Sequence, residues 1–346
     1  MTSTAIHGNP VSPAADLGDV RGEFEALLSS CGIYDLSSRA KIALTGGDRV
    51  RWLNGMVTNN IRDLAQGHGV YAFLLNPQGH ILGDLYAYNR GDSLILDSDQ
   101  SQSQKLLATF DHYIIMDDVE VANVSEKLTA IGIAGPKVRE VLGAAGLEIS
   151  ELEPLQFVDV TWRNVAVTVV RADNASVESY ELCLSPNQVT LLRDALTKAG
   201  ATASGTTALE LLRIAAGIPR YGQDIRERDL PQETEQQRAV HFSKGCYIGQ
   251  EIVERIRSRG AVHRKFTGFE VQGALPALGA KIQADGRDIG EITSAASLPL
   301  AGGERRMALG YIRREIATPG KQFQVGSTQL SVATLPFSEI FGRANL

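Results

Sequence analysis

The sequence contains few cysteines, histidines and aromatic residues. It has 346 residues, of which three are cysteine, six are histidine and 6% are aromatic. Cys31, Cys183 and Cys246 are odd in number and widely spaced, which argues against both a disulfide framework and a CxxC metal site. The histidines are scattered without metal-ligand spacing, so we expect no zinc. A reduced, cytoplasmic location is therefore predicted.

Long apolar runs and an excess of positive charge are also missing. No apolar run approaches the length of a membrane span, and the net charge is −6 with a pI of about 5.6. We therefore expect no membrane insertion and no direct nucleic-acid binding. Residues 1–20 are polar, are interrupted by Pro and Gly, and lack the apolar core of a signal peptide. They are predicted to form a disordered tail.

The chain from residue 21 to residue 255 alternates strand and helix patterns. RAKIALTGGD, at residues 39–48, alternates like a strand and ends at Asp48, which can cap a following helix. YAFLLN, ILGDLYAY and SLILDS come next, separated by the turns NPQG and NRGD, and predict an antiparallel meander. Residues 42–55 resemble residues 131–143, since both read strand, glycine turn, helix. This echo indicates a duplicated α+β layout.

The pattern changes near residue 260. HRKFTGFEVQG, AKIQADGRDIGEITSAA, MALGYIRR and QFQVGSTQLSVATL are short, closely spaced strands, and Asp285-Gly286 is a good hairpin turn. No long helix is indicated here. A separate C-terminal β-barrel domain is therefore predicted over residues 260–346.

Two carboxylates lie inside apolar strand patterns. Asp84 occurs in GDLYAY, and Glu181 occurs in SYELCLS. Period-two alternation places Glu181 and Cys183 on one face of their strand, and Tyr180 and Leu182 on the other. Each acid lies either on a solvated face or in a cleft. In a cleft it can accept hydrogen bonds from an amine or act as a general base.

The most distinctive stretch is KGCYIGQE, at residues 244–251. Isoleucine recurs here at every fourth position, which predicts a helix beginning at Gly249. Cys246 then precedes the helix N-terminus, where the helix dipole and Lys244 both favour a lowered thiol pKa. The alternative is a small buried cysteine in a turn, with Gly245 and Gly249 present only for backbone geometry.

These residues carry a family resemblance. KGCYIGQE resembles the signature of the YgfZ-type folate-binding proteins, the iron–sulfur cluster accessory branch of the glycine-cleavage T-protein superfamily. The blocks that resemble the superfamily as a whole are GGDRVRWLNGMVTNNIRDLAQGHGVYAFLLNPQGHILGDL, LLRIAAGIPRYGQDI and GAKIQADGRDIGEITSAASLPLAGGERRMALGYI. The resemblance implies a monomer of α+β class arranged as a three-part ring. Two interleaved subdomains at residues 21–255 and the barrel then surround a central tetrahydrofolate.

The resemblance also assigns site residues. Asp84 matches the second of two adjacent acids beside the folate reaction centre, whereas Gly83 stands in place of the first. Glu181 matches the pterin-binding glutamate, and one carboxylate can bind the adjacent amide N–H and amino group of a pterin. Arg213 and Tyr221 match an arginine and a tyrosine of the central block. Arginine suits the carboxylates of a folate glutamate tail.

The motif is where this chain differs from the transferases, whose sequence at these positions resembles KGDFIGKE. Cys246 therefore stands where they have aspartate. The residues that match the accessory-branch signature are Lys244, Gly245, Cys246, Tyr247, Gly249, Gln250 and Glu251. The basic stretch RIRSRGAVHRK, at residues 255–265, either attracts a polyglutamate tail or forms a solvated surface.

The leading functional hypothesis is a tetrahydrofolate-binding accessory factor for iron–sulfur cluster assembly or repair. Cys246 would be its essential thiol, Asp84 would act beside it, and its partners would be assembly or client proteins. One cysteine cannot hold a cluster alone, so no resident metal is expected. The alternative is a folate-dependent aminomethyltransferase, which Asp84 favours and the altered motif opposes. A folate-dependent demethylase or oxidase would need a flavin domain, and no credible dinucleotide fingerprint occurs.

Overall fold

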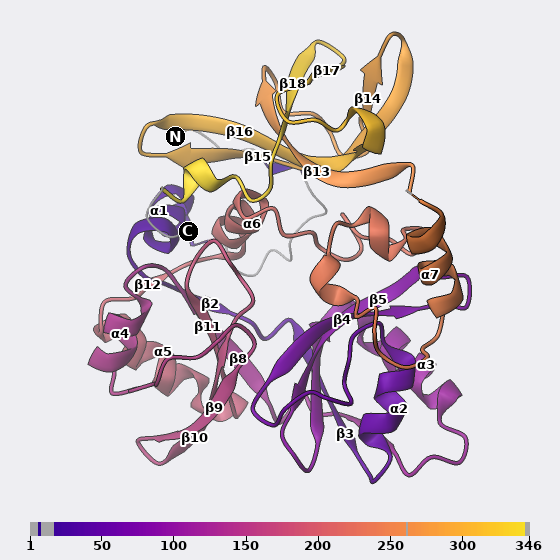
Figure 1. Cartoon of the computed structure of the whole chain (residues 1–346). Helices are drawn as coiled ribbons and strands as arrows, with labels where there is room; N and C mark the ends of the chain where they lie inside the picture. The colour runs from indigo at the N-terminus through magenta and orange to yellow at the C-terminus, as the bar shows by residue number, and fades with distance from the viewer. Residues whose placement is uncertain (1–5, 8–16, 261, 343–346) are drawn as a thin grey trace.

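The computed structural model describes residues 6–7, 17–260 and 262–342, which form three parts arranged as a ring (Figure 1). Two α+β parts stand side by side, and a β-barrel lies across them. Most of the predicted disordered tail, residues 1–5 and 8–16, lies outside the described residues. Within its span, β1 (Ile6–His7) pairs with barrel strand β15 (Arg287–Leu300).

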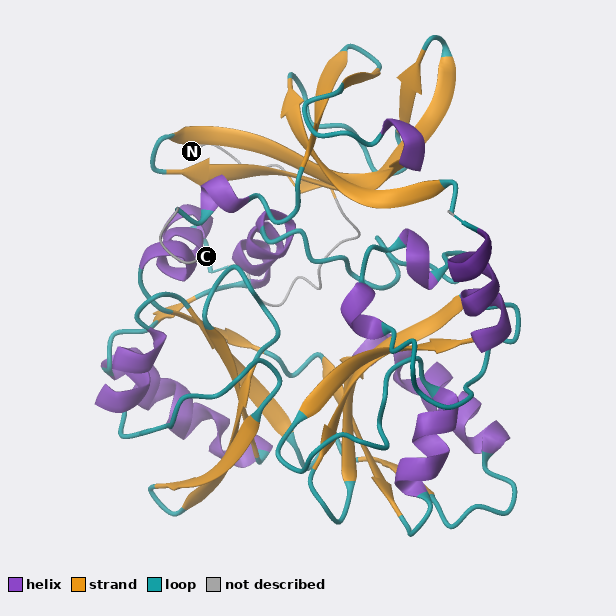
Figure 2. Ribbon diagram, viewed as in Figure 1, coloured by secondary structure: helices purple, strands orange, loops and turns teal. Residues whose placement is uncertain are grey.

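The first α+β part is a five-stranded antiparallel sheet in the order β4-β5-β6-β3-β7, with helices on one face (Figure 2). Strands β4, β5 and β6 form the predicted meander. The apolar residues of one sheet face are buried against both helices in a single core. The elements of this part are β3 (Arg39–Thr45), α2 (Arg49–Met56), β4 (Gly69–Leu75), β5 (Ile81–Asn89), β6 (Leu94–Asp99), α3 (Ser103–Tyr113) and β7 (Glu120–Asn123).

The second α+β part is a six-stranded sheet in the order β12-β2-β8-β11-β10-β9. Only the short β12–β2 pair is parallel. Its apolar face packs on two helices that lie on its outer side. The elements of this part are β2 (Gly32–Asp35), β8 (Thr129–Ala134), α4 (Val138–Ala144), β9 (Phe157–Trp162), β10 (Val165–Arg171), β11 (Ser179–Leu184), α5 (Val189–Lys198) and β12 (Thr202–Ala203).

The sequence echo corresponds to β3–α2 in one part and β8–α4 in the other. In each part the helices cover the outer face of the sheet, so the helix-free faces of the two sheets turn toward each other (Figure 2). A small cluster that includes Tyr88 from β5, Phe157 from β9 and Cys183 from β11 joins these faces. The duplicated layout therefore places strand residues of both parts along a shared interior.

The barrel closes because β15 pairs with both β14 and β16, giving the circular order β15-β14-β17-β18-β13-β16. Helices α1 (Val20–Ser29) and α6 (Thr206–Ala215) lie beneath it and share an apolar core with it. No helix in the described ranges is long and apolar enough to cross a membrane. The other barrel strands are β13 (Arg264–Gln272), β14 (Lys281–Ala284), β16 (Gly303–Arg313), β17 (Gln322–Val325) and β18 (Thr328–Ala333).

Candidate functional site

A narrow cavity lies between the helix-free faces of the two sheets. Its empty space is about 380 Å³, part of it open to solvent. Tyr88 and Phe157, whose rings pack edge to face with centroids 6.0 Å apart, line it on its aromatic side, and Val170 adds an aliphatic wall. Glu181 on β11 lies 3.9 Å from Lys41 on β3 here, and Arg90 and Asp97 also line the space. Such an aromatic-lined slot with a few polar groups is typical of a small-molecule site.

Glu181 has the least satisfied carboxylate of this cavity. Its Oε2 atom is buried and has no hydrogen-bond partner among the described residues, and Lys41 Nζ is 3.9 Å away. Lys41 and Arg39 both form ion pairs with Asp97, so Asp97 is the main partner of these two cations. Burial and the charge of Asp97 raise the pKa of Glu181, against the opposing charges of Lys41 and Arg39. The site holds a carboxylate acceptor that lacks a donor.

An aromatic ring approaches the backbone closely beside Glu181. The Tyr34 ring lies against Gly132, which pairs with Glu181 across β8 and β11. A Cβ atom at position 132 would lie 1.9 Å from a Tyr34 ring carbon, so only glycine lets the ring lie there. Burial and then Glu181 raise the pKa of Tyr34, which keeps its hydroxyl neutral. Glycine at position 132 thus lets the Tyr34 ring pack beside the strand that carries Glu181.

Asp84 lies on β5 and is firmly held. Its Oδ2 accepts a hydrogen bond from the Tyr71 hydroxyl at 2.7 Å, and its Oδ1 accepts one from Gln102 Nε2 at 2.7 Å. Tyr86 links this acid to the cavity, because its ring lies 4.9 Å from that of Tyr71 and 6.5 Å from that of Tyr88. A row of tyrosines therefore connects the surroundings of Asp84 with those of Glu181.

Tyr221 lies behind the same strand. Its hydroxyl donates to the carbonyl of Leu82 at 2.5 Å and accepts from Lys105 Nζ at 2.6 Å. Lys105 also pairs with Glu227 at 2.7 Å. Leu82 is two residues before Asp84 on β5, so these contacts fix the strand on which Asp84 stands.

A larger cavity opens between the second α+β part, the segment that follows α6 and the barrel. It encloses about 1390 Å³ of empty space, including open solvent, and residues of the β10–β11 loop, the end of α6 and the barrel line it. Arg238 lies at this junction, 4.7 Å from the Tyr71 ring centroid, and pairs with Asp173 of the β10–β11 loop. Because Tyr71 donates to Asp84, this cavity borders the surroundings of that acid.

Lys244, the first residue of the KGCYIGQE motif, binds the backbone that follows α2. Its ammonium donates to three backbone carbonyls, those of Asn54 at 2.6 Å, Val57 at 2.7 Å and Asn59 at 2.6 Å. Burial and the nearby Arg62 lower the pKa of Lys244 to about 7. The three carbonyls favour the ammonium form, which alone has three N–H donors. Its donors are committed to the backbone after α2.

Cys246 follows on a loop, where its side chain is exposed. Helix α7 (Gln250–Arg259) begins four residues later, one position beyond the predicted start. Gly249 caps it with φ +81°, and a Cβ there would lie 2.6 Å from the carbonyl oxygen of Asn76. Tyr247 is buried, and its hydroxyl has no partner within the described ranges. The motif therefore packs against the NPQG turn and leaves its thiol outside.

The rest of the motif is polar and local. Gln250 Oε1 accepts from the Tyr247 N–H at 3.3 Å, and Glu251 pairs with Arg255 at 2.6 Å. Arg257 of the basic stretch pairs with Glu254 and lies over the Phe242 ring. These contacts engage two of the stretch's cations locally.

The structure places Arg213 away from the two-sheet cavity, between α6 and the barrel. Its guanidinium donates to Glu210, to Asp224 at 2.7 Å, to the carbonyl of Ile218 at 2.8 Å and to Ser294 at 2.9 Å. These contacts occupy all five of its N–H groups. Its predicted contact with a glutamate tail stays a prediction.

Glu181 thus lines the cavity between the sheets, Asp84 lies on β5 with Tyr221 behind that strand, and Arg213 and the motif lie elsewhere. Sequence reasoning did not single out Lys41, Asp97, Tyr86 or Arg238. The alternation of RAKIALT contained a signal for one of them, since it places Lys41 on the face opposite Ile42. Among the described residues, no group of three or more His, Cys, Asp or Glu side chains is arranged to hold a metal ion.

A ring of two facing α+β parts and a barrel, with a buried carboxylate oxygen between the sheets that lacks a hydrogen bond, is the arrangement expected of a small-molecule-binding protein. The chain belongs to the GCVT N-terminal domain family, whose model matches residues 15–244. This assigns it to the T-protein superfamily, as the sequence predicted; its place in the YgfZ-type branch stays a prediction.

Its relatives include aminomethyltransferases. The chain is 28% identical over 300 residues to that of Rubrobacter xylanophilus, covering 86% of this chain and 80% of the relative. It is 29% identical over 314 residues to that of Halothermothrix orenii, covering 88% and 86%. The crystal structure of the glycine cleavage system aminomethyltransferase T from Bartonella henselae superposes with a TM-score of 0.84 at 23% identity, covering 93% and 90%. That likeness confirms the predicted fold.

Proposed function

We propose that the cavity between the two sheets binds the pterin ring of tetrahydrofolate. The observation that supports this is the buried Oε2 of Glu181, which lacks a donor. A pterin edge presents an amide N–H beside an amino group, and both suit one carboxylate. Tyr88 and Phe157 supply aromatic surface for a flat ring. The residues present therefore fit the group.

Asp84 is the residue proposed to act on the bound one-carbon unit. Tyr71 and Gln102 hold both of its oxygens, so the carboxylate is oriented before any ligand arrives. Tyr221 supports the strand from behind through Leu82. Tetrahydrofolate supplies the one-carbon chemistry when bound, while Asp84 accepts hydrogen bonds from an amine of the reacting group.

Calorimetric titration of tetrahydrofolate into the wild-type chain and into Glu181→Ala tests this binding. We expect a single site in the wild type and a loss of most of the affinity in the variant. Absence of binding by the wild type would remove the basis of the proposed pocket.

At a finer level, we propose an accessory factor for iron–sulfur cluster assembly or repair that uses the thiol of Cys246. Two features support it. The thiol is exposed on the loop before α7, and Lys244 and Gly249 lock that loop to the rest of the fold. A cluster or its fragment would be cargo shared with partner proteins, because a single thiolate does not hold one alone.

Aminomethyl transfer is the second candidate, favoured by the names of the curated relatives and by Asp84. An assay with lipoyl carrier protein, tetrahydrofolate and ammonia release separates the two. Robust turnover that survives Cys246→Ala supports the transferase. Loss of cluster-enzyme activities in cells that carry only Cys246→Ala, without such turnover, supports the accessory factor.

A further inference from the structure

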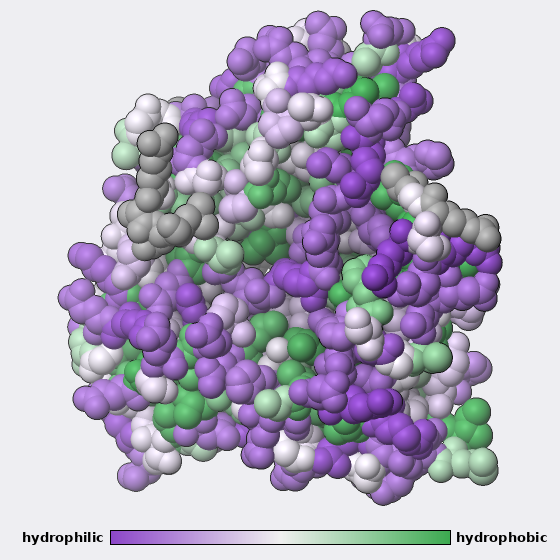
Figure 3. All heavy atoms as spheres, viewed as in Figure 1, coloured by the Kyte–Doolittle hydropathy of each residue, from purple (hydrophilic) through white to green (hydrophobic). Residues whose placement is uncertain are grey.

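A third cavity lies on the seam between the barrel and the segment that joins α6 to α7. Its empty space is about 950 Å³, including open solvent. Strongly hydrophilic residues gather where the barrel meets the α7 side of the molecule (Figure 3). The basic residues that line the cavity are Arg228, His263, Arg264, Lys281 and Arg313, and its acids are Asp288 and Glu291.

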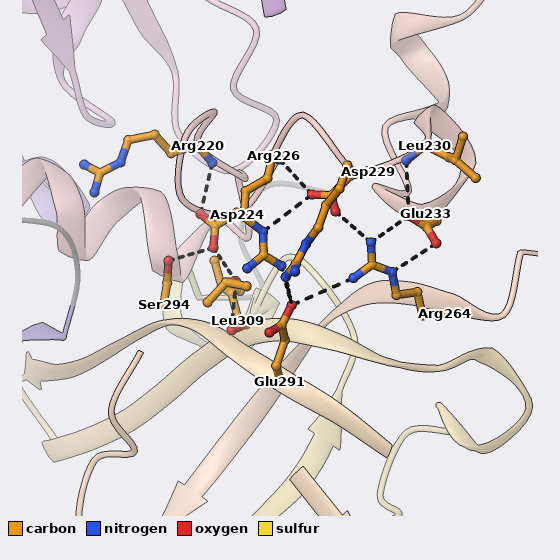
Figure 4. Close-up of polar contacts among 12 residues, drawn as sticks. Arg220, Asp224, Arg226, Asp229, Leu230, Glu233, Arg264, Glu291, Ser294 and Leu309 are labelled. Atoms are coloured by element: carbon orange, nitrogen blue, oxygen red, sulfur yellow. Dashed lines mark hydrogen bonds and ion pairs between the residues drawn. The ribbon is translucent and has the colours of Figure 1, made fainter. Parts of the chain in front are cut away.

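Glu291 cannot neutralise this group of cations, because it is shared among several of them. Arg226 pairs with its Oε1, Arg228 lies 2.8 Å from the same oxygen, and Lys281 lies 3.2 Å from Oε2. Figure 4 shows Glu291 pointing from the barrel toward Arg226 and Arg264. Burial alone raises the pKa of Glu291, but the hydrogen bonds and charges of Arg226 and Lys281 outweigh it, so the carboxyl is ionised. Positive charge remains in excess around it.

Two arginines oppose each other across neighbouring strands. Arg264 on β13 and Arg313 on β16 are direct partners in the antiparallel ladder. Arg264 is bound by Asp229 at 2.7 Å and Glu233 at 3.0 Å (Figure 4), whereas Arg313 is exposed and has no ion pair or side-chain hydrogen bond within the described ranges. The charge of Arg264 is therefore already balanced by carboxylates, and Arg313 is the member of this pair whose guanidinium is available to an anion.

Tyr311 supplies an unpaired donor on the same face. The residue is 1% exposed, lines the cavity, and its hydroxyl has no hydrogen-bond partner among the described residues. The guanidinium of Arg264 lies 4.8 Å from its ring centroid. Burial raises the pKa of Tyr311 well above its usual range, so the hydroxyl keeps its proton. The charged groups around it are the Arg264 guanidinium and the carboxylates of Asp229, Asp224 and Glu233, so its hydroxyl is a buried donor without an acceptor that can serve an anionic oxygen arriving beside Arg264.

We propose that this cavity binds a small, multiply charged oxyanion, with Arg228 and Arg313 at its mouth and the Tyr311 hydroxyl donating from its inner wall. Guanidinium groups bind both phosphate and carboxylate oxygens in a bidentate manner, so the oxyanion carries one of these two groups. The proposed tetrahydrofolate pocket uses none of these residues. The seam site is therefore separate from it.

Thermal unfolding of the full chain in inorganic phosphate, citrate or sodium chloride at equal ionic strength tests the site. A ligand that binds only the folded chain raises the Tm with its concentration. Phosphate or citrate is expected to raise the Tm of the wild type beyond the chloride control. Stabilisation by phosphate alone identifies a phosphate ligand, and stabilisation by citrate alone identifies a carboxylate ligand.

Two variants and one control make the test specific. Arg313→Gln is expected to weaken the apparent affinity about tenfold, the effect of losing one charged contact. Arg287→Gln removes an exposed barrel charge outside the cavity and should leave the affinity unchanged. Tyr311→Phe should unfold at the same or a higher temperature without anion, yet lose part of the anion-dependent shift. Equal Tm values in all three salts, or an unchanged response of Arg313→Gln, would overturn the proposal.

Discussion

Glu181→Gln should change ligand affinity and stability in opposite directions. The variant keeps the shape of the side chain but removes the charge that the proposed pocket uses. A charge-assisted pair of hydrogen bonds contributes about 1.5–3 kcal/mol, which corresponds to a loss of roughly 10- to 150-fold in affinity for tetrahydrofolate. Calorimetry on the two proteins at pH 7 measures this difference directly.

The stability effect follows from the unpaired oxygen of Glu181. The pKa of this carboxyl is raised on folding, first by burial and then by Asp97, from an ordinary value of 4.5. The folded chain therefore binds a proton that the unfolded chain has already released. Its contribution to stability is present below pH 4.5 and is lost as pH rises through the folded pKa. At pH 7, above the ordinary value for this carboxyl, the raised pKa is a cost to the stability of the ligand-free wild type.

Glu181→Gln removes that cost, so the ligand-free variant should be more stable at pH 7 by about 1 kcal/mol. This is a rise in Tm of about 2 °C, which should disappear on acidification. Urea titrations at pH 7 and pH 4 provide the measurement. Glu120→Gln, at an exposed position on β7, is the matched control and should change neither quantity. Wild-type affinity in Glu181→Gln, or a lower stability at pH 7, would refute the reasoning.

Three further predictions concern the motif. Brief alkylation of the native chain should modify Cys246 alone, because Cys31 and Cys183 are buried and their pKa values are raised to about 12. In denaturant all three cysteines should react, and mass spectrometry can measure both outcomes. Gly249→Ala should lose more stability than the control Gly222→Ala. Each substitution costs about 1 kcal/mol because the backbone φ there is positive, but only Gly249→Ala adds a Cβ clash. Equal losses of Tm in the two variants would exclude that clash. Lys244→Met should cost about 3 kcal/mol in urea unfolding by leaving three carbonyls without donors, whereas the exposed Lys137→Met should cost almost nothing.

Local patterning predicted much of the fold. Period-two alternation correctly placed Glu181 and Cys183 opposite Tyr180 and Leu182, since the last two are buried in the helix-covered core of their sheet and Cys183 lies in the cluster between the sheets. The echo between residues 42–55 and 131–143 corresponds to two strand–helix units. These features depend on residues that are close together in the sequence, so they can be predicted from the sequence alone.

The helix dipole argument at Cys246 shows where that reasoning stops. The sequence placed the helix start within one residue, but the ammonium of Lys244 donates to carbonyls near residues 54–59, far away along the chain. The lysine therefore anchors the segment, and its N–H groups do not point to the thiol. No local pattern indicates which distant carbonyls a side chain will reach.

By itself, the sequence determined the order of the elements, the faces on which their residues lie, and the superfamily to which the chain belongs. Only the tertiary structure decided how the charges are shared. Asp97 takes both Arg39 and Lys41 and leaves Glu181 without a donor, while Arg213 is fully used between α6 and the barrel. The physical reason is that hydrogen bonds and ion pairs act over a few ångströms in space. Which groups come that close depends on how the two sheets and the barrel pack together.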